Sequence, residues 1–429
     1  MRKIIAFLVT LCIISAGNAA TIINDTETER LLNELVMPLA KAADISPDRL
    51  KIHIIHSDEF NAFVSGGEDV YVYTGLLTQI KSPGALQAVV AHELGHTIGG
   101  HVAQMSDRMA AEMRRAMIIQ ALGVGLMVAG GNPSMGMGVL AGAGGVATSG
   151  LMAFSRDEER MADNLGLNLM IRAGQNPNGF IEVFEQMRNI TGAAENTINP
   201  NRINHPLTTE RLKNVREYIA AHPGKYKQNN FGPRYDLVRA KLIGYLAPAG
   251  RVRDMYPDSD KSDAALYARA ISDVRSGNLG VAHDGVARLI SKNNKNPYFY
   301  ELMGDIEYQS GNYDSSVAAY ENALRYAGDA PQIQTALALV LTERRGANDT
   351  GRAIELCLRA NLVQETPLAY WTLARAYDDG RADWARAEYY EMMGDTKTAK
   401  KYARRAQKKL SKNTPEYIKS GDILNKRDK

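Results

Sequence analysis

Cysteine is nearly absent from this chain of 429 residues, which contains only Cys12 and Cys357. Cys12 lies in an N-terminal segment that we predict to be cleaved off, so that Cys357 remains alone in the mature chain. An oxidising compartment therefore finds no intramolecular disulfide to form.

An excess of charge of either sign is also absent. The chain has 51 Lys and Arg residues against 48 Asp and Glu residues, and loss of Arg2 and Lys3 with the N-terminal segment leaves 49 against 48. A nearly neutral chain gives no general electrostatic reason to expect nucleic acid as a partner, and we predict none. With 45% hydrophobic and 23% charged residues, the composition is that of an ordinary globular protein, long enough for two or three domains.

The first of two conspicuous apolar stretches, residues 4–15, is too short to span a bilayer comfortably. Arg2 and Lys3 precede it, and a small-residue cleavage site, Gly17-Asn18-Ala19, follows it. This order is typical of a secretory signal. We predict a cleaved signal peptide over residues 1–20, with an uncleaved anchor as the alternative.

The second stretch, residues 116–155, contains no charged residue and divides at Gly131-Asn132-Pro133 into two glycine-rich halves. Each half is slightly short for a transmembrane helix, and glycine lowers helix propensity. We predict a helical hairpin packed against the surrounding domain. Peripheral membrane contact and a mobile loop are the alternatives.

The motif HELGH at residues 92–96 carries the most specific chemistry. Side chains four residues apart on a helix lie about 40° apart, so His92 and His96 can share one metal ion. Glu93 projects from the flank, where it can take a proton from a metal-bound water. The motif predicts a zinc site with Glu93 as the general base. The alternative is a pair of surface histidines on an amphipathic helix.

The third ligand needs a choice between His101 and a more distant residue. A common zinc protease pattern, HExxHxxGxxH, fits Gly99, but His101 arrives one residue early. On a continuous helix His101 faces away from the metal. A break at Gly99 and Gly100 could redirect it, but its offset would still not match the three-histidine pattern.

The segment from Phe154 to Gly166 offers a better ligand. Ser155 and Glu158 form a capping box, which occupies Glu158 at the start of a helix and leaves Glu159 available. Asp163 lies one turn after Glu159 on the same face. We predict Glu159 as the third zinc ligand, with Asp163 accepting the free ring N–H of a ligating histidine. Two acids on a solvated helix is the alternative.

Beyond residue 262 the sequence repeats. Gly277 and Asn278 are matched by Gly311 and Asn312 at an offset of 34 residues, typical of tetratricopeptide repeats. A further unit contains Gly394 in the corresponding place, and residues 331–377 repeat less regularly. We predict an α-solenoid over residues 263–429, joined by a linker at residues 249–262.

HELGH, SRDEERMAD, the NAF–GG–YVYTGLL region and the repeats together resemble the BepA-type periplasmic zinc metalloproteases of Gram-negative bacteria. These are soluble relatives of the HtpX peptidases. The resemblance covers nearly the whole mature chain. It implies one Zn²⁺ bound by His92, His96 and Glu159, with Glu93 as the catalytic acid/base. It also implies a periplasmic location and degradation of misassembled outer-membrane β-barrel proteins near the barrel-assembly machinery.

The resemblance extends to NHPLTTER, which contains His205, Pro206 and Arg211. In such relatives this histidine can occupy the metal's open position and keep the enzyme silent. His205 is therefore a candidate regulatory ligand, and a loop histidine fixed by the neighbouring proline is the alternative.

The expected fold is mostly α, of the α+β type: a gluzincin-like zinc metallopeptidase domain at residues 21–248, with the hairpin of residues 116–155 over or beside the active site, followed by the solenoid. Strands are predicted at residues 51–56 and 69–73, and the second is expected to pair with the substrate backbone. We expect an endopeptidase with chaperone-like activity. The alternatives are an assembly adaptor in which proteolysis is minor, and a membrane-inserted protease.

Overall fold

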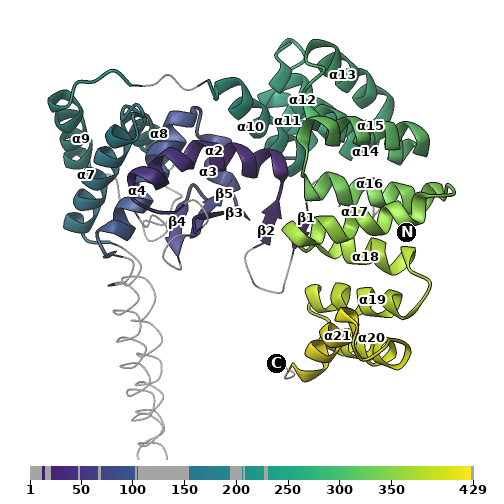
Figure 1. Cartoon of the computed structure of the whole chain (residues 1–429). Coiled ribbons are helices and arrows are strands. Elements are labelled where there is room, and N and C mark those ends of the chain that lie inside the picture. The colour runs from purple at the N-terminus through teal and green to yellow at the C-terminus, as the bar shows by residue number, and fades with distance from the viewer. Residues whose placement is uncertain are drawn as a thin grey trace, which may run out of the picture.

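The computed structural model describes residues 12–14, 21–46, 49–65, 69–101, 104, 154–193, 205, 208–226 and 230–426. An N-terminal domain with a small sheet is followed by a stack of helices that reaches the C-terminus (Figure 1). Most of the predicted hairpin, residues 116–153, lies outside the described residues, as does Pro206. No helix among the described residues is long and apolar enough to cross a membrane.

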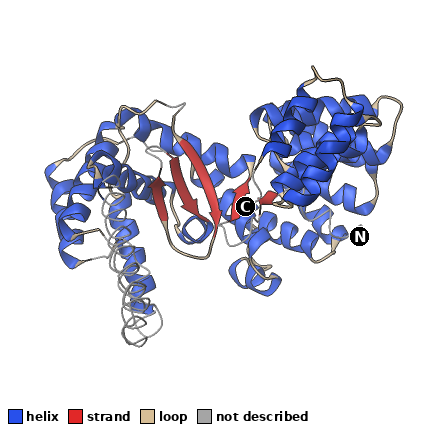
Figure 2. Cartoon of the chain, turned by 90° about the horizontal axis from the view of Figure 1, so that it is seen from below, coloured by secondary structure: helices blue, strands red, loops and turns tan. Residues whose placement is uncertain are grey.

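One sheet of five strands, in the order β1-β2-β3-β5-β4, lies between two helical regions of the molecule (Figure 2). β3 and β5 run parallel, and the other neighbouring strands are antiparallel. The strands predicted from KIHIIH and DVYVY are confirmed as β3 and β5. The bounds are β1 (Cys12–Ile14), β2 (Thr21–Asn24), β3 (Lys51–His56), β4 (Ala62–Ser65) and β5 (Asp69–Tyr73).

The two edges of this sheet differ from expectation. β1 lies inside the predicted signal peptide and pairs with β2, so cleavage after residue 20 would remove one edge strand. At the other edge, β4 covers β5 from Ser65 opposite Asp69 to Ala62 opposite Val72. The expectation that residues 69–73 pair with a substrate backbone is therefore wrong, because β3 and β4 already use both edges of β5. Among the described strands, β4 forms the edge of the sheet on this side.

Helix α4 (Pro83–Ile98) begins as the sequence predicts. The Ser82 side chain accepts a hydrogen bond from the Ala85 N–H, and Pro83 occupies the first turn, where its missing N–H has no helical partner. α4 packs against β4 and crosses α7 (Arg156–Arg172). The crossing is close: a Cβ added to Gly95 would lie 2.5 Å from the Ala162 carbonyl oxygen. Glycine at this contact brings the two helices together.

The hydrophobic core of the N-terminal domain combines α2, the sheet, α4 and the helices that follow. Leu31, Leu35 and Leu39 lie on one face of α2 and are essentially fully buried, as the helical spacing of 4 residues requires. The remaining helices of this part are α2 (Thr26–Ala42), α3 (Thr74–Gln79), α8 (Gly179–Ala193), α9 (Thr209–Ala221), α10 (Gly232–Leu246) and α11 (Ala249–Met255). The predicted linker thus contains α11.

The C-terminal helices stack in antiparallel pairs (Figure 1). α12, α14 and α16 begin at residues 263, 297 and 331, which keeps the offset of 34 residues. Tyr320 packs where a Cβ on Gly304 would lie 2.7 Å from its ring, so a side chain at residue 304 would displace it. The helices are α12 (Asp263–Arg275), α13 (Leu279–Lys292), α14 (Pro297–Ser310), α15 (Tyr313–Ala327), α16 (Pro331–Arg344), α17 (Asp349–Val363), α18 (Pro367–Ala376), α19 (Gly380–Met392), α20 (Thr396–Lys409) and α21 (Pro415–Asn425).

The less regular part of the repeat has a structural cause. α18 is only 10 residues long, and α19 packs against both α18 and α20. The unit that contains Gly394 therefore begins at α19, one helix later than a continuous series of pairs would place it. An inserted helix shifts the repeat phase.

A buried ionic contact joins the N-terminal domain to the repeats. Lys241 of α10 is 1% exposed, and its Nζ lies 2.6 Å from Asp25, 3.3 Å from Glu27 and 3.3 Å from Glu301. The Tyr267 hydroxyl donates a hydrogen bond of 3.1 Å to Glu27. We call Asp25, Glu27, Lys241 and Glu301 the junction cluster. It connects the start of α2 with α10 and α14, and the hydrogen bond from Tyr267 adds α12.

Candidate metal centre

Three side chains of HELGH are buried inside the domain. His92 is 8% exposed, Glu93 4% and His96 1%. The alternative of two surface histidines is therefore wrong. The ring Nε2 atoms of His92 and His96 lie 3.2 Å apart, as expected for two residues one helical turn apart that point the same way.

Helix α7 brings the predicted carboxylates to the same place. Its capping box is formed: the Ser155 N–H donates to Glu158 at 2.7 Å, and the Ser155 hydroxyl accepts from the Glu158 N–H. Glu158 is thus held at the helix start. Glu159 is fully buried, and its carboxylate oxygens lie 3.5 Å from His92 Nε2 and 3.5 Å from His96 Nε2.

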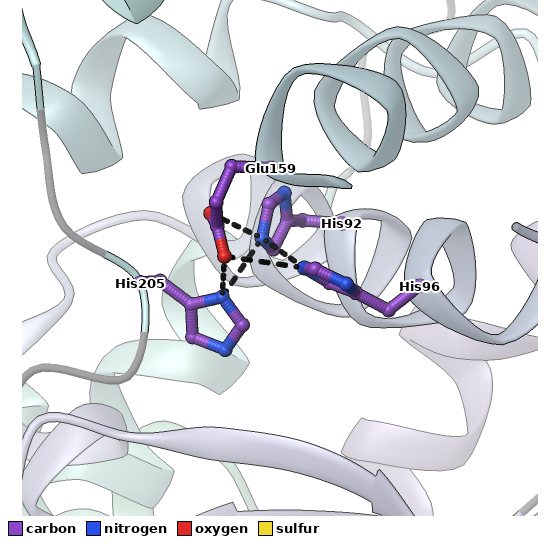
Figure 3. Close-up of side chains that lie close together, drawn as sticks. All are labelled: His92, His96, Glu159 and His205. Carbon is purple, nitrogen blue, oxygen red and sulfur yellow. Dashed lines mark hydrogen bonds and ion pairs between the residues drawn. The ribbon is translucent and has the colours of Figure 1, made fainter. Parts of the chain in front are cut away.

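His205 completes a group of four side chains that face one another (Figure 3). Its Nδ1 lies 2.8 Å from Glu159 Oε1 and 3.3 Å from His92 Nε2. Its Nε2 lies 3.4 Å from Glu93 Oε1. The structure therefore brings together the three predicted ligands, His92, His96 and Glu159, and the candidate regulatory ligand His205, although they are up to 113 positions apart.

The donor atoms lie close enough together to surround one ion. One ligand atom from each of His92, His96, Glu159 and His205 can be chosen so that all lie within 4.8 Å of one another. Zinc bonds of about 2.0–2.1 Å imply tetrahedral edges of about 3.3–3.4 Å. The separations between ring nitrogens, 3.2 and 3.3 Å, match those edges. Three imidazole nitrogens and one carboxylate form a donor set that suits Zn²⁺.

Asp163 and Arg211 form the layer behind the donors. Asp163 Oδ1 lies 2.9 Å from His92 Nδ1, the ring atom on the side away from the donor cluster. The Arg211 guanidinium donates two hydrogen bonds of 2.8 Å to Asp163 and lies 2.7 Å from Glu159 Oε2. Burial alone would raise the pKa of Asp163, but hydrogen bonds from Arg211 and His92 lower it, so the carboxylate stays ionised. Asp163 can thereby hold the His92 ring in place.

Glu93 is not one of the four grouped donors. Burial is the main reason that the pKa of its carboxyl is raised, with the nearby histidines acting in the opposite direction. A carboxylate with a raised pKa is a better general base near neutral pH than an exposed one.

Two aromatic side chains surround His96 in a way that sequence spacing did not indicate. The Phe154 ring stacks on the His96 ring, with centroids 3.8 Å apart. His101 is 2% exposed, lies outside the group of four donors, and places its Nδ1 3.0 Å from His96 Nδ1. The role of Arg211 was signalled only by its place in NHPLTTER.

This fold and donor set define a metallopeptidase domain, and comparison with known families agrees. Residues 26–219 match Peptidase family M48, a family of zinc metallopeptidases. Residues 26–219, less than half of the chain, are therefore similar to this family. The predicted enzyme class, a zinc metallopeptidase, its cofactor and the mostly helical fold class are confirmed.

The chain is also similar to several individually named proteases. The chain is 24% identical over 346 residues to the "Beta-barrel assembly-enhancing protease" of Yersinia pestis, covering 76% of this chain and 68% of the relative. It is 25% identical over 317 residues to the protein of that name in Escherichia coli K12, covering 71% of this chain and 63% of that one. The chain is also 26% identical over 194 residues to the "Mitochondrial metalloendopeptidase OMA1" of Schizosaccharomyces pombe, covering 45% and 53%. The predicted resemblance to BepA-type proteases is confirmed, and the chain spans about two thirds or less of their length.

Proposed function

We propose that this protein is a periplasmic zinc endopeptidase that degrades misassembled outer-membrane β-barrel proteins. The observation that carries the peptidase activity is the buried group His92, His96, Glu159 and His205, with Glu93 beside it. The client class and the periplasmic location are supported by the names of the bacterial relatives and by the secretory pattern of residues 1–20.

His92, His96 and Glu159 would hold the ion, with His205 in the fourth position at rest. Bound Zn²⁺ would polarise the scissile carbonyl and lower the pKa of a bound water to about 7. Glu93 accepts the proton of the attacking water and passes it to the leaving amine. Asp163, held by Arg211, keeps the His92 ring oriented throughout.

A substrate chain in extended conformation can pair with β4. Among the described strands, β4 pairs only with β5, and it packs against α4, the helix that carries His92 and His96. Its second edge offers backbone N–H and C=O groups for strand addition, which depends weakly on side chains. This edge therefore accounts for cleavage of many sequences, and the choice of client falls to the repeats, as concave helical stacks bind proteins.

One observation favours the adaptor as a second function. His205 lies where the fourth donor of a tetrahedral site belongs, and a site with four protein ligands is closed to substrate. In that resting state the protein could bind clients through its repeats without cutting them.

The test is zinc content and proteolysis of an unstructured protein such as casein by the mature chain. Glu93→Gln should retain zinc and lose about 10²–10⁴-fold in rate, because it removes the general base and no ligand. Glu217→Gln, on the exposed side of α9, is the matched control and should behave as the wild type. Equal rates in the wild type and Glu93→Gln would leave the adaptor as the function.

A further inference from the structure

The backbone leaves the α-helical conformation just after the zinc-binding helix, and the next residue places a histidine side chain against that helix. α4 ends at Ile98, and Gly100 has a φ of +72°, a left-handed conformation that glycine adopts without strain. His101 is thereby turned back toward α4 instead of continuing round the helix. Its Nδ1 reaches a point 3.0 Å from Nδ1 of His96.

The contact fixes which atom carries the proton. His96 presents Nε2 to the other donors, 3.2 Å from His92 Nε2 and 3.5 Å from Glu159. A ring that binds metal through Nε2 carries its hydrogen on Nδ1, so that atom must donate. At 3.0 Å the acceptor is Nδ1 of His101, whose own ring hydrogen is then on Nε2.

His92 and His96 thus have different partners on their outer sides. His92 Nδ1 faces the Asp163 carboxylate at 2.9 Å, whereas His96 Nδ1 faces the ring of His101 at 3.0 Å. Ligating histidines normally donate their second ring N–H to a group that sets the ring orientation. The stacked Phe154 holds the plane of the His96 ring, and a hydrogen bond at Nδ1 distinguishes the two ring orientations that differ by a 180° flip about the Cβ–Cγ bond.

Gly99 is also explained by this contact. A Cβ at residue 99 would lie 2.7 Å from both Cε1 and Nε2 of the His101 ring. Any other residue at this position would push His101 away from His96. The Gly99-Gly100 pair therefore allows the His101 ring to contact His96.

We propose that His101 is a positioning residue: it accepts the Nδ1–H of His96 and holds that ring with Nε2 toward the metal. The inference rests on the proposed zinc site and assigns a role to a residue outside it.

The test compares two substitutions at residue 101 by zinc affinity of the full mature chain, measured with a competing chelator. His101→Leu keeps much of the apolar volume and has no acceptor, and it should weaken zinc binding about 10–100-fold. His101→Asn is smaller but places its amide oxygen near the position of Nδ1, and should stay within a few-fold of the wild type. The visible spectrum of the Co²⁺-loaded proteins should change in the leucine variant and be retained in the asparagine variant.

A second pair of variants approaches the contact from Gly99. Gly99→Ala should weaken zinc affinity with His101 intact, because the added Cβ displaces the ring. Gly250→Ala, whose Cβ would meet nothing within 4 Å, is the matched control. Thermal unfolding of the metal-free proteins verifies that each variant folds.

The zinc affinities distinguish failure of the positioning role from failure of the proposed zinc site. Zinc affinity of His101→Leu equal to that of the wild type overturns the positioning role. The reverse order, with asparagine weak and leucine normal, shows that His101 only fills space and also overturns it. A wild type that binds no zinc at all overturns the proposed function, whereas normal zinc binding unaffected at residue 101 leaves that function intact.

Discussion

His205 differs from the other three donors in how it is held. His92, His96 and Glu159 project from α4 and α7, whereas His205 lies outside every described helix, between α8 and α9. Its side chain is 15% exposed, against 10% for His92 and 1% for His96. His205 is thus the most exposed of the four donors and the only one of them that lies outside a described helix.

His205→Ala should therefore be more active than the wild type. If His205 occupies the fourth position at rest, its removal opens that position to water beside Glu93. An initial rate on casein about 10-fold higher is expected for loss of a contact worth about 1.4 kcal/mol. The double variant Glu93→Gln/His205→Ala should be inactive, which shows that any gain depends on the same chemistry.

A lower rate with zinc retained would contradict the switch. It would instead assign His205 to stabilisation of the tetrahedral intermediate, because an imidazole N–H can donate to a developing oxyanion. Its Nε2, 3.4 Å from Glu93, lies near enough to the general base for that alternative.

Spacing along helices explains which residues of the site could be predicted from the sequence. His92 with His96, and Glu159 with Asp163, are each four positions apart, and helix geometry alone aligns such pairs. The position of His101 beside His96 could not be predicted from helical spacing. It depends on the positive φ of Gly100, which the spacing of residues does not reveal. The stacking of Phe154 on His96 could not be predicted either, because the two rings come from different helix ends and no sequence spacing relates them.

At the scale of elements, the site depends on how closely α4 and α7 approach. Gly95 on α4 and Gly166 on α7 lie at the crossing, where added Cβ atoms would come within 2.5 Å of Ala162 and 2.9 Å of Ala91 backbone atoms. Glycine on both helices lets Glu159 reach the two histidines. The distance between the helix axes thus sets the distances between donors.

Gly166→Ala should separate the helices and weaken the site without touching a donor. Overpacking of this kind lowers the free energy of unfolding by about 1–3 kcal/mol. Zinc affinity should fall together with stability in urea unfolding of the metal-free and zinc-loaded protein. Gly250→Ala should change neither zinc affinity nor stability. Normal zinc affinity in Gly166→Ala would show that the two helices can move apart without disturbing the donors.

The strands show what local patterns leave undecided. Residues 51–56 and 69–73 were recognisable as strands because their β-branched and aromatic residues favour extended structure. Their order in the sheet was not, because β4 contributes only four residues and gives little alternation to detect. Because this short strand was not predicted, the substrate edge was assigned to β5, which is an interior strand.

At the scale of the whole molecule, the junction cluster joins the catalytic domain and the repeats into one unit. Its three carboxylates share the ammonium of Lys241 within 3.3 Å. Burial raises the pKa of Glu27 to about 7 and that of Glu301 to about 8, with Lys241 opposing the shift. No sequence motif marks these residues, because each is an ordinary charged side chain on its own helix and only the tertiary fold brings them together.

The cluster predicts a pH dependence of stability. Both carboxyls have folded-state pKa values above the 4.5 of an exposed glutamate, so the folded protein binds their protons more tightly than the unfolded chain does. Their contribution is full below about pH 4.5 and is lost as the pH rises through about 7 and 8. The melting temperature should therefore fall by several degrees between about pH 6 and about pH 9.

Glu301→Gln should flatten this fall, because an amide cannot ionise, and differential scanning calorimetry at several pH values would measure it. Glu217→Gln, in an exposed ion pair on α9, should leave the slope unchanged. Parallel slopes in the wild type and Glu301→Gln would remove the junction cluster as the cause.

The same junction constrains the order in which the molecule can be completed. Glu27 and Tyr267 are 240 positions apart, and Thr26 and Gln332, which also share a hydrogen bond, are 306 positions apart. The chain is made from its N-terminus, so the first turn of α2 emerges long before α12 and α16 exist. Until then Asp25 and Glu27 have water as their neighbour in place of the repeats. The earliest helix to be synthesised thus reaches its final environment only when the repeats are in place, and a chain that ends before α16 lacks the contact between Thr26 and Gln332.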